Sequence, residues 1–149
     1  MTCEGKIRED LKEALKLRDK ERASILRMLL SEIKNAEIAQ RKPLDDDKIL
    51  DVISKEVKRH RESIEAFKQG NRDDLVAQEK AELSTLMKYL PKQMSHEEIK
   101  TAAQRVIETV EVKGMKGKGN VMAQLMPQLK GKADGKEVSE VVSELLATV

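Results

Sequence analysis

The sequence predicts an all-α protein: an N-terminal helical domain with a long antiparallel helical hairpin, followed by a small C-terminal three-helix bundle. First, 38% of the 149 residues are charged and 39% hydrophobic, a balance typical of amphipathic helices with wide solvated faces. Second, apolar residues recur at intervals of three and four along most of the chain. Third, prolines and capping residues separate these periodic stretches.

Two helices are expected before Pro43. The first covers Lys6 to about Leu17. The second begins after Asp19, whose carboxylate can cap it, or continues from the first with a bend. It is expected to end near Arg41, because a proline disfavours helical backbone at the residue before it.

The next two predicted helices form the antiparallel hairpin. The first of them opens with the acidic run at residues 45–47, and Gly70 is expected to end it in a left-handed conformation. Asn71 or Asp73 begins the second, which stops at Pro91. One regular apolar face identifies the first of these helices: Ile49, Ile53, Val57, His60, Ile64 and Phe67.

The segment LPKQMS at residues 90–95 is predicted to join two domains, residues 1–92 and 95–149. Ser95 and Glu98 have the three-residue spacing of a capping box, so a new helix is expected to begin there.

Two further helices are predicted to complete the C-terminal bundle. One begins at about Gly119 and is ended or kinked by Pro127. The other follows Asp134 and Glu137, which have a second capping-box spacing.

One stretch differs from the rest of the chain. Residues 113–136 contain five of the seven glycines and six lysines against one acidic residue. Glycine lets the backbone approach a partner closely, and clustered lysine creates a positive field. The alternative is that these glycines cap and turn helices while the lysines keep the turns soluble. We predict a binding surface made by Lys116, Lys118, Lys130, Gly131, Lys132 and Lys136.

These glycines do not form a nucleotide-binding loop. Gly114 and Gly119 have the spacing of a Walker loop, but Asn120 stands where that loop needs lysine. Gly117 and Gly119 begin a GxGxxG pattern, but Met122 stands at its last glycine. No nucleophile has an evident base either. We therefore expect a chain that is not an enzyme by itself and needs no cofactor.

Few side chains suit metal binding, disulfides or base stacking. Cys3 is the only cysteine, so no intrachain disulfide can form. His60 falls on an apolar helix face, which predicts a packed core or boundary histidine. His96 has no cysteine or histidine nearby, so no metal site is predicted. Phe67 and Tyr89 are the only aromatic residues, too few for a platform on which bases stack.

The chain shows no run apolar enough for a signal peptide or a membrane span, so a cytoplasmic protein without membrane contact is predicted. Residues 115–146, MKGKGNVMAQLMPQLKGKADGKEVSEVVSELL, resemble the signature of the YqeY family of small bacterial proteins. Residues 17–38 and 88–95 are similar to the same family. This resemblance implies a bacterial, all-helical, two-domain protein.

The resemblance also implies a partner. The C-terminal domain is similar to the GatB-like tail domain of the glutamine-dependent tRNA amidotransferase, which implies a non-catalytic accessory protein that binds tRNA or other structured RNA. An alternative is an adaptor that docks on an amidotransferase or an aminoacyl-tRNA synthetase through the N-terminal hairpin. The family is also associated with carbon–nitrogen ligase activity with glutamine as amido donor, but the kinase-like domain that hosts this reaction has no counterpart here.

Overall fold

A computed structural model describes residues 2–111 and 114–148. Within these residues the regular structure consists of α-helices and two short 3-10 helices, which confirms the all-α prediction. The chain divides into two compact units, residues 1–90 and 91–149. No helix in the described part is long and apolar enough to cross a bilayer. Lys113, the first residue of the lysine- and glycine-rich stretch, lies outside the described residues.

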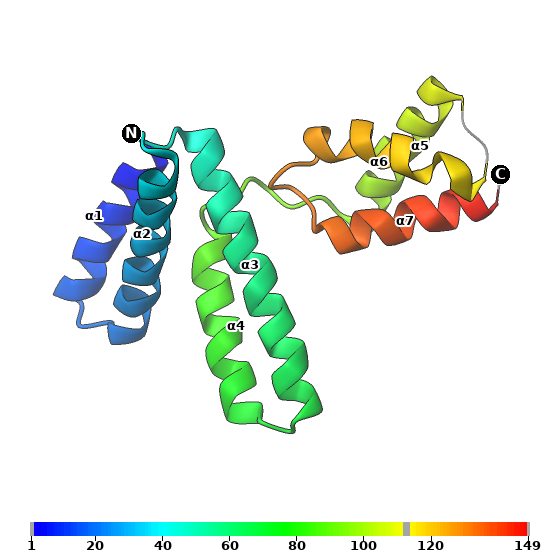
Figure 1. The fold of residues 1–149 in the computed structure, drawn as a ribbon. Helices are drawn as coiled ribbons and strands as arrows, with labels where there is room; N and C mark the ends of the chain where they lie inside the picture. Colours follow the sequence, from blue (N-terminus) through cyan, green and yellow to red (C-terminus); the bar gives the residue numbers. More distant parts are fainter. Residues whose placement is uncertain (1, 112–113, 149) are drawn as a thin grey trace. The chain divides into compact units, whose positions relative to one another are not determined.

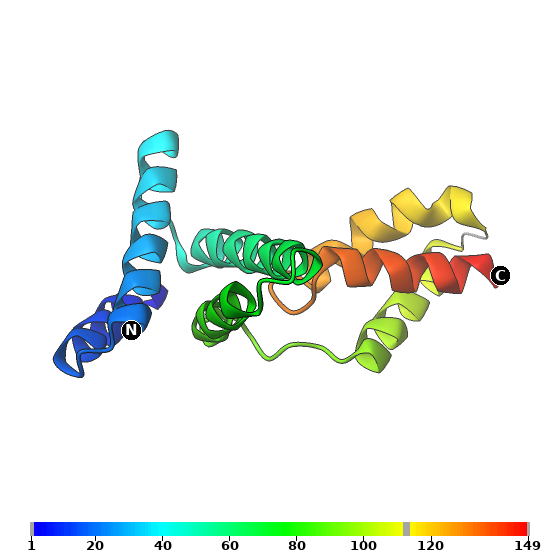
Figure 2. The ribbon, with the colours of Figure 1, turned by 90° about the horizontal axis from the view of Figure 1, so that it is seen from below.

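The first unit contains α1 (Cys3–Lys16), α2 (Lys20–Gln40), α3 (Asp46–Gln69) and α4 (Asp73–Met87). α1 packs along α2 and α3 packs along α4, and α2 also contacts both α3 and α4 (Figures 1 and 2). These contacts bury one apolar cluster, to which all four helices contribute: Ile7, Ile25, Leu26, Leu29, Ile33, Ile49, Ile53, Val57 and Leu86.

Local capping bonds explain where α1, α2 and α3 begin. The Asp19 and Asp45 carboxylates each accept a hydrogen bond from the backbone N–H three residues later, at 3.2 and 2.9 Å, and so begin α2 and α3. α1 begins three residues before the predicted Lys6, because the Thr2 hydroxyl accepts the Gly5 N–H at 3.0 Å.

The turn between α3 and α4 corrects one prediction. Gly70 has a φ of −86°, and the left-handed residue is Asn71, with a φ of 55°. Asparagine tolerates this conformation because its short polar side chain can bond locally. The Arg72 N–H then closes the turn on the Phe67 carbonyl at 2.9 Å.

The last residues of the first unit are tied to its first helix. The Tyr89 hydroxyl donates a hydrogen bond to the Asp10 carboxylate, which also lies 4.0 Å from the Arg22 guanidinium. The Lys6 ammonium lies 5.8 Å from the centre of the Tyr89 ring. Polar contacts therefore hold the end of this unit against α1.

The second unit contains α5 (His96–Val110), α6 (Lys118–Leu125) and α7 (Gly135–Ala147). The 3-10 helices η1 (Met115–Gly117) and η2 (Met126–Gln128) extend α6 at its two ends. α5, α6 and α7 contact one another pairwise (Figure 1). Their shared cluster is entirely apolar: Ile99, Ala103, Val106, Val121, Leu125, Leu129, Val138, Val141, Val142 and Leu146.

The start of α5 has the predicted capping box. The Ser95 hydroxyl accepts the Glu98 N–H, and the Glu98 carboxylate accepts the Ser95 N–H, both at 3.2 Å. Pro127 lies in η2, where the α-helix has already given way to the tighter 3-10 form. A proline is tolerated there because α6 ends at Leu125.

Candidate functional site

Two of the predicted binding residues, Lys116 and Lys118, lie at the start of α6, and we call them the α6 lysine group. Lys116 is exposed in η1, and Lys118 is the half-buried first residue of α6. The first turn of α6 has no acidic residue, and neither η1 nor α6 has a side-chain cap. Backbone N–H groups at a helix start carry partial positive charge, so these lysines add to an existing positive field.

The other three lysines form the α7 lysine group. Lys130 is half-buried and Lys132 exposed in the turn before α7, and Lys136 is exposed in the first turn of that helix. Two acids are interspersed with them. Asp134 caps α7 by accepting the Lys136 N–H at 3.4 Å, and Glu137 follows in the first turn. The positive field is therefore more balanced here than at α6.

Gly131 has a structural role in the same turn. Its φ is +74°, and a Cβ added there would lie 3.4 Å from Pro91 Cδ. Its carbonyl accepts a hydrogen bond from Gln93 Nε2 at 2.8 Å, and the neighbouring Lys132 carbonyl accepts the Met94 N–H at 2.8 Å. The turn is thus hydrogen-bonded to the segment that leads into α5. This role matches the alternative given for these glycines, in which they turn the chain.

The fold separates the two lysine groups. α6 and α7 run side by side in opposite directions, and η1 contacts α7 (Figure 1). Between Lys118, the first residue of α6, and Lys130 lie the other seven residues of α6, the three of η2 and Leu129. At about 1.5 Å and 2.0 Å per residue, they separate the groups by roughly 18 Å. The six predicted residues therefore make two basic sites on the second unit rather than one.

The single cysteine is poorly suited to nucleophilic chemistry. Burial raises the pKa of the Cys3 thiol, the Asp46 carboxylate raises it further, and only Lys6 opposes them. A thiol with a raised pKa contains little thiolate, the reactive form, at neutral pH. This environment does not activate the Cys3 thiol as a nucleophile.

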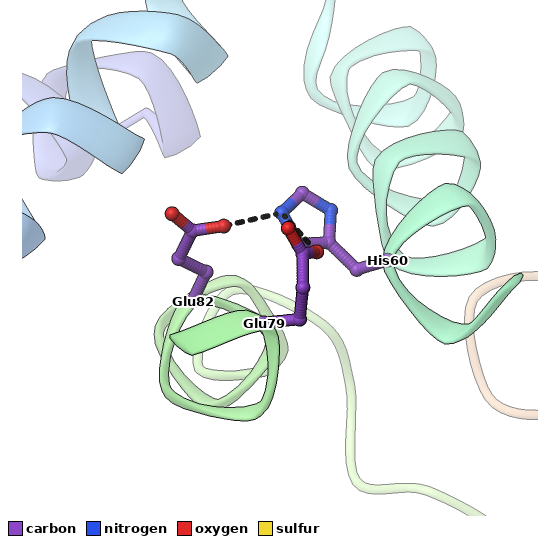
Figure 3. Close-up of side chains that lie close together, drawn as sticks. All are labelled: His60, Glu79 and Glu82. Carbon is purple, nitrogen blue, oxygen red and sulfur yellow. Dashed lines mark hydrogen bonds and ion pairs between the residues drawn. The ribbon is translucent and has the colours of Figure 1, made fainter. Parts of the chain in front are cut away.

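A second polar cluster joins the two helices of the hairpin, and the sequence reasoning did not find it. His60 on α3 points at Glu79 and Glu82 on α4 (Figure 3). His60 Nε2 lies 3.1 Å from Glu82 Oε2 and 3.6 Å from Glu79 Oε2. The histidine is only 8% exposed. We call these three residues the His60 cluster.

The second ring nitrogen of His60 also has a polar contact, and the two glutamates of this cluster affect each other's charge. His60 Nδ1 lies 2.9 Å from the Glu56 carbonyl oxygen. Burial raises the pKa of Glu79, the nearby His60 lowers it, and the Glu82 carboxylate raises it again. Two carboxylates are thus held close together where solvent screens them only in part.

The sequence contains a signal for the His60 cluster, but it can be recognised only when the two helices of the hairpin are aligned with each other. Glu79 and Glu82 are three residues apart and so share one face of α4. His60 precedes the turn at Asn71 by about as many residues as the two glutamates follow it. An antiparallel hairpin brings such positions together, whereas the apolar periodicity of α3 alone assigned His60 to the core.

A model of the family described as Yqey-like protein matches residues 4–146, which is nearly the whole chain. The chain belongs to the YqeY family. This confirms the resemblance noted in the sequence, and the family match spans both lysine groups and the His60 cluster.

Several curated relatives of this YqeY-family chain come from fungi. The "Altered inheritance of mitochondria protein 41, mitochondrial" of Pyrenophora tritici-repentis is 30% identical over 145 residues, covering 95% of this chain and 79% of the relative. Proteins of the same name from Eremothecium gossypii and Saccharomyces cerevisiae are 41% and 38% identical over 85 residues. In both of these, the match covers 56% of this chain and 46% of the relative, so it spans about half of their length.

These names contradict the prediction of a bacterial, cytoplasmic protein, because the relatives are eukaryotic proteins named as mitochondrial. The prediction rested on the absence of a long apolar run and on a resemblance to bacterial sequences. Both features depend on the helices of the folded protein. Such helices have the same apolar pattern in any aqueous compartment, so the pattern does not indicate which compartment the protein occupies.

Proposed function

We propose that this YqeY-family protein is a non-catalytic accessory protein, related to glutamine-dependent tRNA amidotransferase, that binds tRNA or another structured RNA through its second unit. One observation carries the proposal: both lysine groups lie at helix starts. Lysine is unfavourable there, because its charge opposes the positive end of the helix dipole. A bound phosphate reverses this effect, since it interacts favourably with both the lysines and the helix-start N–H groups that no side chain caps.

The composition of the surface determines the kind of contact. Phe67 and Tyr89 are the only aromatic residues, and both belong to the first unit. The second unit therefore supplies no ring on which bases stack, and the proposed contacts are to phosphates and folded shape. Two basic sites separated by roughly 18 Å of helix suit a structured RNA better than a small anion.

Binding of total tRNA to the full chain across a salt series tests this proposal. Each neutralised phosphate contributes about 0.7–0.9 to the slope of log affinity against log salt, so five lysines predict a slope of roughly −3.5 to −4.5. The double variants Lys116→Glu/Lys118→Glu and Lys132→Glu/Lys136→Glu should each flatten the slope by about 1.4–1.8. Glutamate is favourable at a helix start, so neither variant should lose helical content.

The matched control is Lys55→Glu/Lys58→Glu, which reverses two exposed lysines on α3 and gives the same net charge. It should bind tRNA with the slope of the parent chain. If all three double variants bind alike, the lysine groups are not the RNA surface. If the control loses binding as well, only the net charge matters.

The adaptor alternative has weaker support. The exposed apolar side chains of the first unit include Leu15 and Leu17 near the end of α1 and Ile38 near the end of α2. α2 carries Ile38 about 27 Å beyond its first residue, so these side chains do not form one patch. A complex with an amidotransferase or synthetase that survives nuclease treatment would favour the adaptor, and glutaminase activity of the pure chain would favour a ligase.

A further inference from the structure

We propose that the His60 cluster is a binding site for one divalent transition-metal ion, best matched by Zn²⁺, with His60 Nε2 and the carboxylates of Glu79 and Glu82 as ligands. The three side chains come from facing positions on α3 and α4 (Figure 3). One ligand atom from each lies within 4.8 Å of the others.

The orientation of the His60 ring supports this site. Nδ1 lies 2.9 Å from the Glu56 carbonyl oxygen, which can only accept a hydrogen bond. Nδ1 must therefore carry a proton and donate it, which directs Nε2 to the two glutamates. A backbone carbonyl that fixes the second ring nitrogen is the usual support of a metal-bound histidine.

Nε2 faces only carboxyl oxygens within this cluster, so a proton or a metal ion must lie between them. Glu79 Oε2 and Glu82 Oε2 are carboxylate oxygens, and a neutral imidazole would direct its lone pair at them. Either a proton shared between Nε2 and a carboxylate or a metal ion between the three groups relieves this repulsion. A proton leaves the cluster with a net charge of −1, whereas a divalent ion balances both carboxylates with a neutral ring.

The distances fit a tetrahedral ion. Zinc binds histidine nitrogen and carboxylate oxygen at about 2.0–2.2 Å, so adjacent ligand atoms in a tetrahedron are about 3.4 Å apart. The two observed separations from Nε2, 3.1 and 3.6 Å, lie on either side of this value. Three protein ligands leave a fourth position for water, and the side chains of Glu79 and Glu82 are 21% and 23% exposed, which allows an ion to enter.

Metal binding by the full, untagged chain tests the proposal. The chain is freed of metal with a chelator and titrated with Zn²⁺ by calorimetry, and bound zinc is counted after equilibrium dialysis. We expect one Zn²⁺ per chain and a higher Tm in its presence. Mg²⁺ prefers six oxygen ligands, so it should bind at least tenfold more weakly than Zn²⁺.

Variants locate the ion. Glu82→Gln keeps the side-chain shape and should weaken Zn²⁺ binding at least tenfold, and His60→Gln should abolish it. His96→Gln is the matched control, because this second histidine is 53% exposed, with Glu137 at 3.7 Å. It should bind Zn²⁺ like the parent chain. Circular dichroism establishes that each variant is folded.

A measurement on the unsubstituted chain makes the test independent of folding defects. The nitrogen chemical shifts of His60 should show Nδ1 protonated and Nε2 shifted on addition of one equivalent of Zn²⁺. The proposal is wrong if zinc binding does not saturate, if His60→Gln binds zinc like the parent, or if Nε2 carries a proton and keeps it when zinc is added.

Discussion

At the scale of single residues, Tyr89 is a point where local electrostatics should affect stability. Burial raises the pKa of its hydroxyl, and the hydrogen bond to Asp10 and the charge of that carboxylate raise it further. A hydroxyl whose pKa is higher in the folded than in the unfolded chain stabilises the fold fully below the unfolded value. That contribution is lost as the pH rises through the folded value.

The variant Tyr89→Phe should therefore be less stable than the parent by about 1–2 kcal/mol at neutral pH, because it lacks a hydrogen bond to a charged group. The deficit should be constant up to the ordinary tyrosine pKa of about 10 and should shrink above it. Urea unfolding of both chains between pH 7 and 11 measures it. A deficit that does not change with pH would show that the hydroxyl has no altered pKa.

Gly131 and Gly119 should respond to alanine with opposite signs. Gly131 has a φ of +74°, which costs a residue with a Cβ about 1–2 kcal/mol, so Gly131→Ala should destabilise the second unit. Gly119 lies in α6 with nothing within 4 Å of an added Cβ. Gly119→Ala should gain about 0.5–1 kcal/mol of helix propensity. The urea concentration at the midpoint of unfolding compares the two variants. Midpoints that shift equally and in the same direction would contradict this account.

At the scale of elements, the capping box at Ser95 should set the stability of α5. Ser95→Ala removes the acceptor for the Glu98 N–H and should cost about 1 kcal/mol in thermal unfolding. Ser84→Ala, on the exposed face of α4, is the control and should change stability little. A Ser95→Ala chain as stable as this control would mean that the cap contributes nothing.

The same capping box predicts an acid dependence. Hydrogen bonds from the Ser95 backbone and side chain lower the pKa of Glu98. A carboxylate with a lowered folded pKa stabilises the protein above its ordinary value and loses that effect as the pH falls through the folded value. Glu98→Gln should remove this part of the acid destabilisation, and unfolding of both chains between pH 3 and 6 measures it.

At the scale of the whole molecule, each of the two units has its own buried apolar cluster. Fragments 1–90 and 91–149 should therefore both fold, and their far-UV circular dichroism should add up to that of the full chain. The second fragment is near the lower size limit for a single core, so it should unfold at the lower temperature. A disordered 91–149 fragment would show that its cluster is insufficient alone.

The parts of the fold that depend on residues close together in the sequence could be predicted from it. Asp19, Asp45 and Ser95 begin helices through bonds to groups three residues away, so a short stretch contains all the partners. The turn after α3 could not be placed to the residue, because Gly70 and Asn71 both tolerate a left-handed conformation.

The sequence by itself determined the all-α class, most helix starts and the family, because periodicity, caps and motifs are local properties of the chain. Only the tertiary structure decided that one lysine-rich stretch makes two separate basic groups, since α6 folds back along α7. It also decided that His60 meets Glu79 and Glu82. That contact depends on the register of two packed helices, which no single helix encodes.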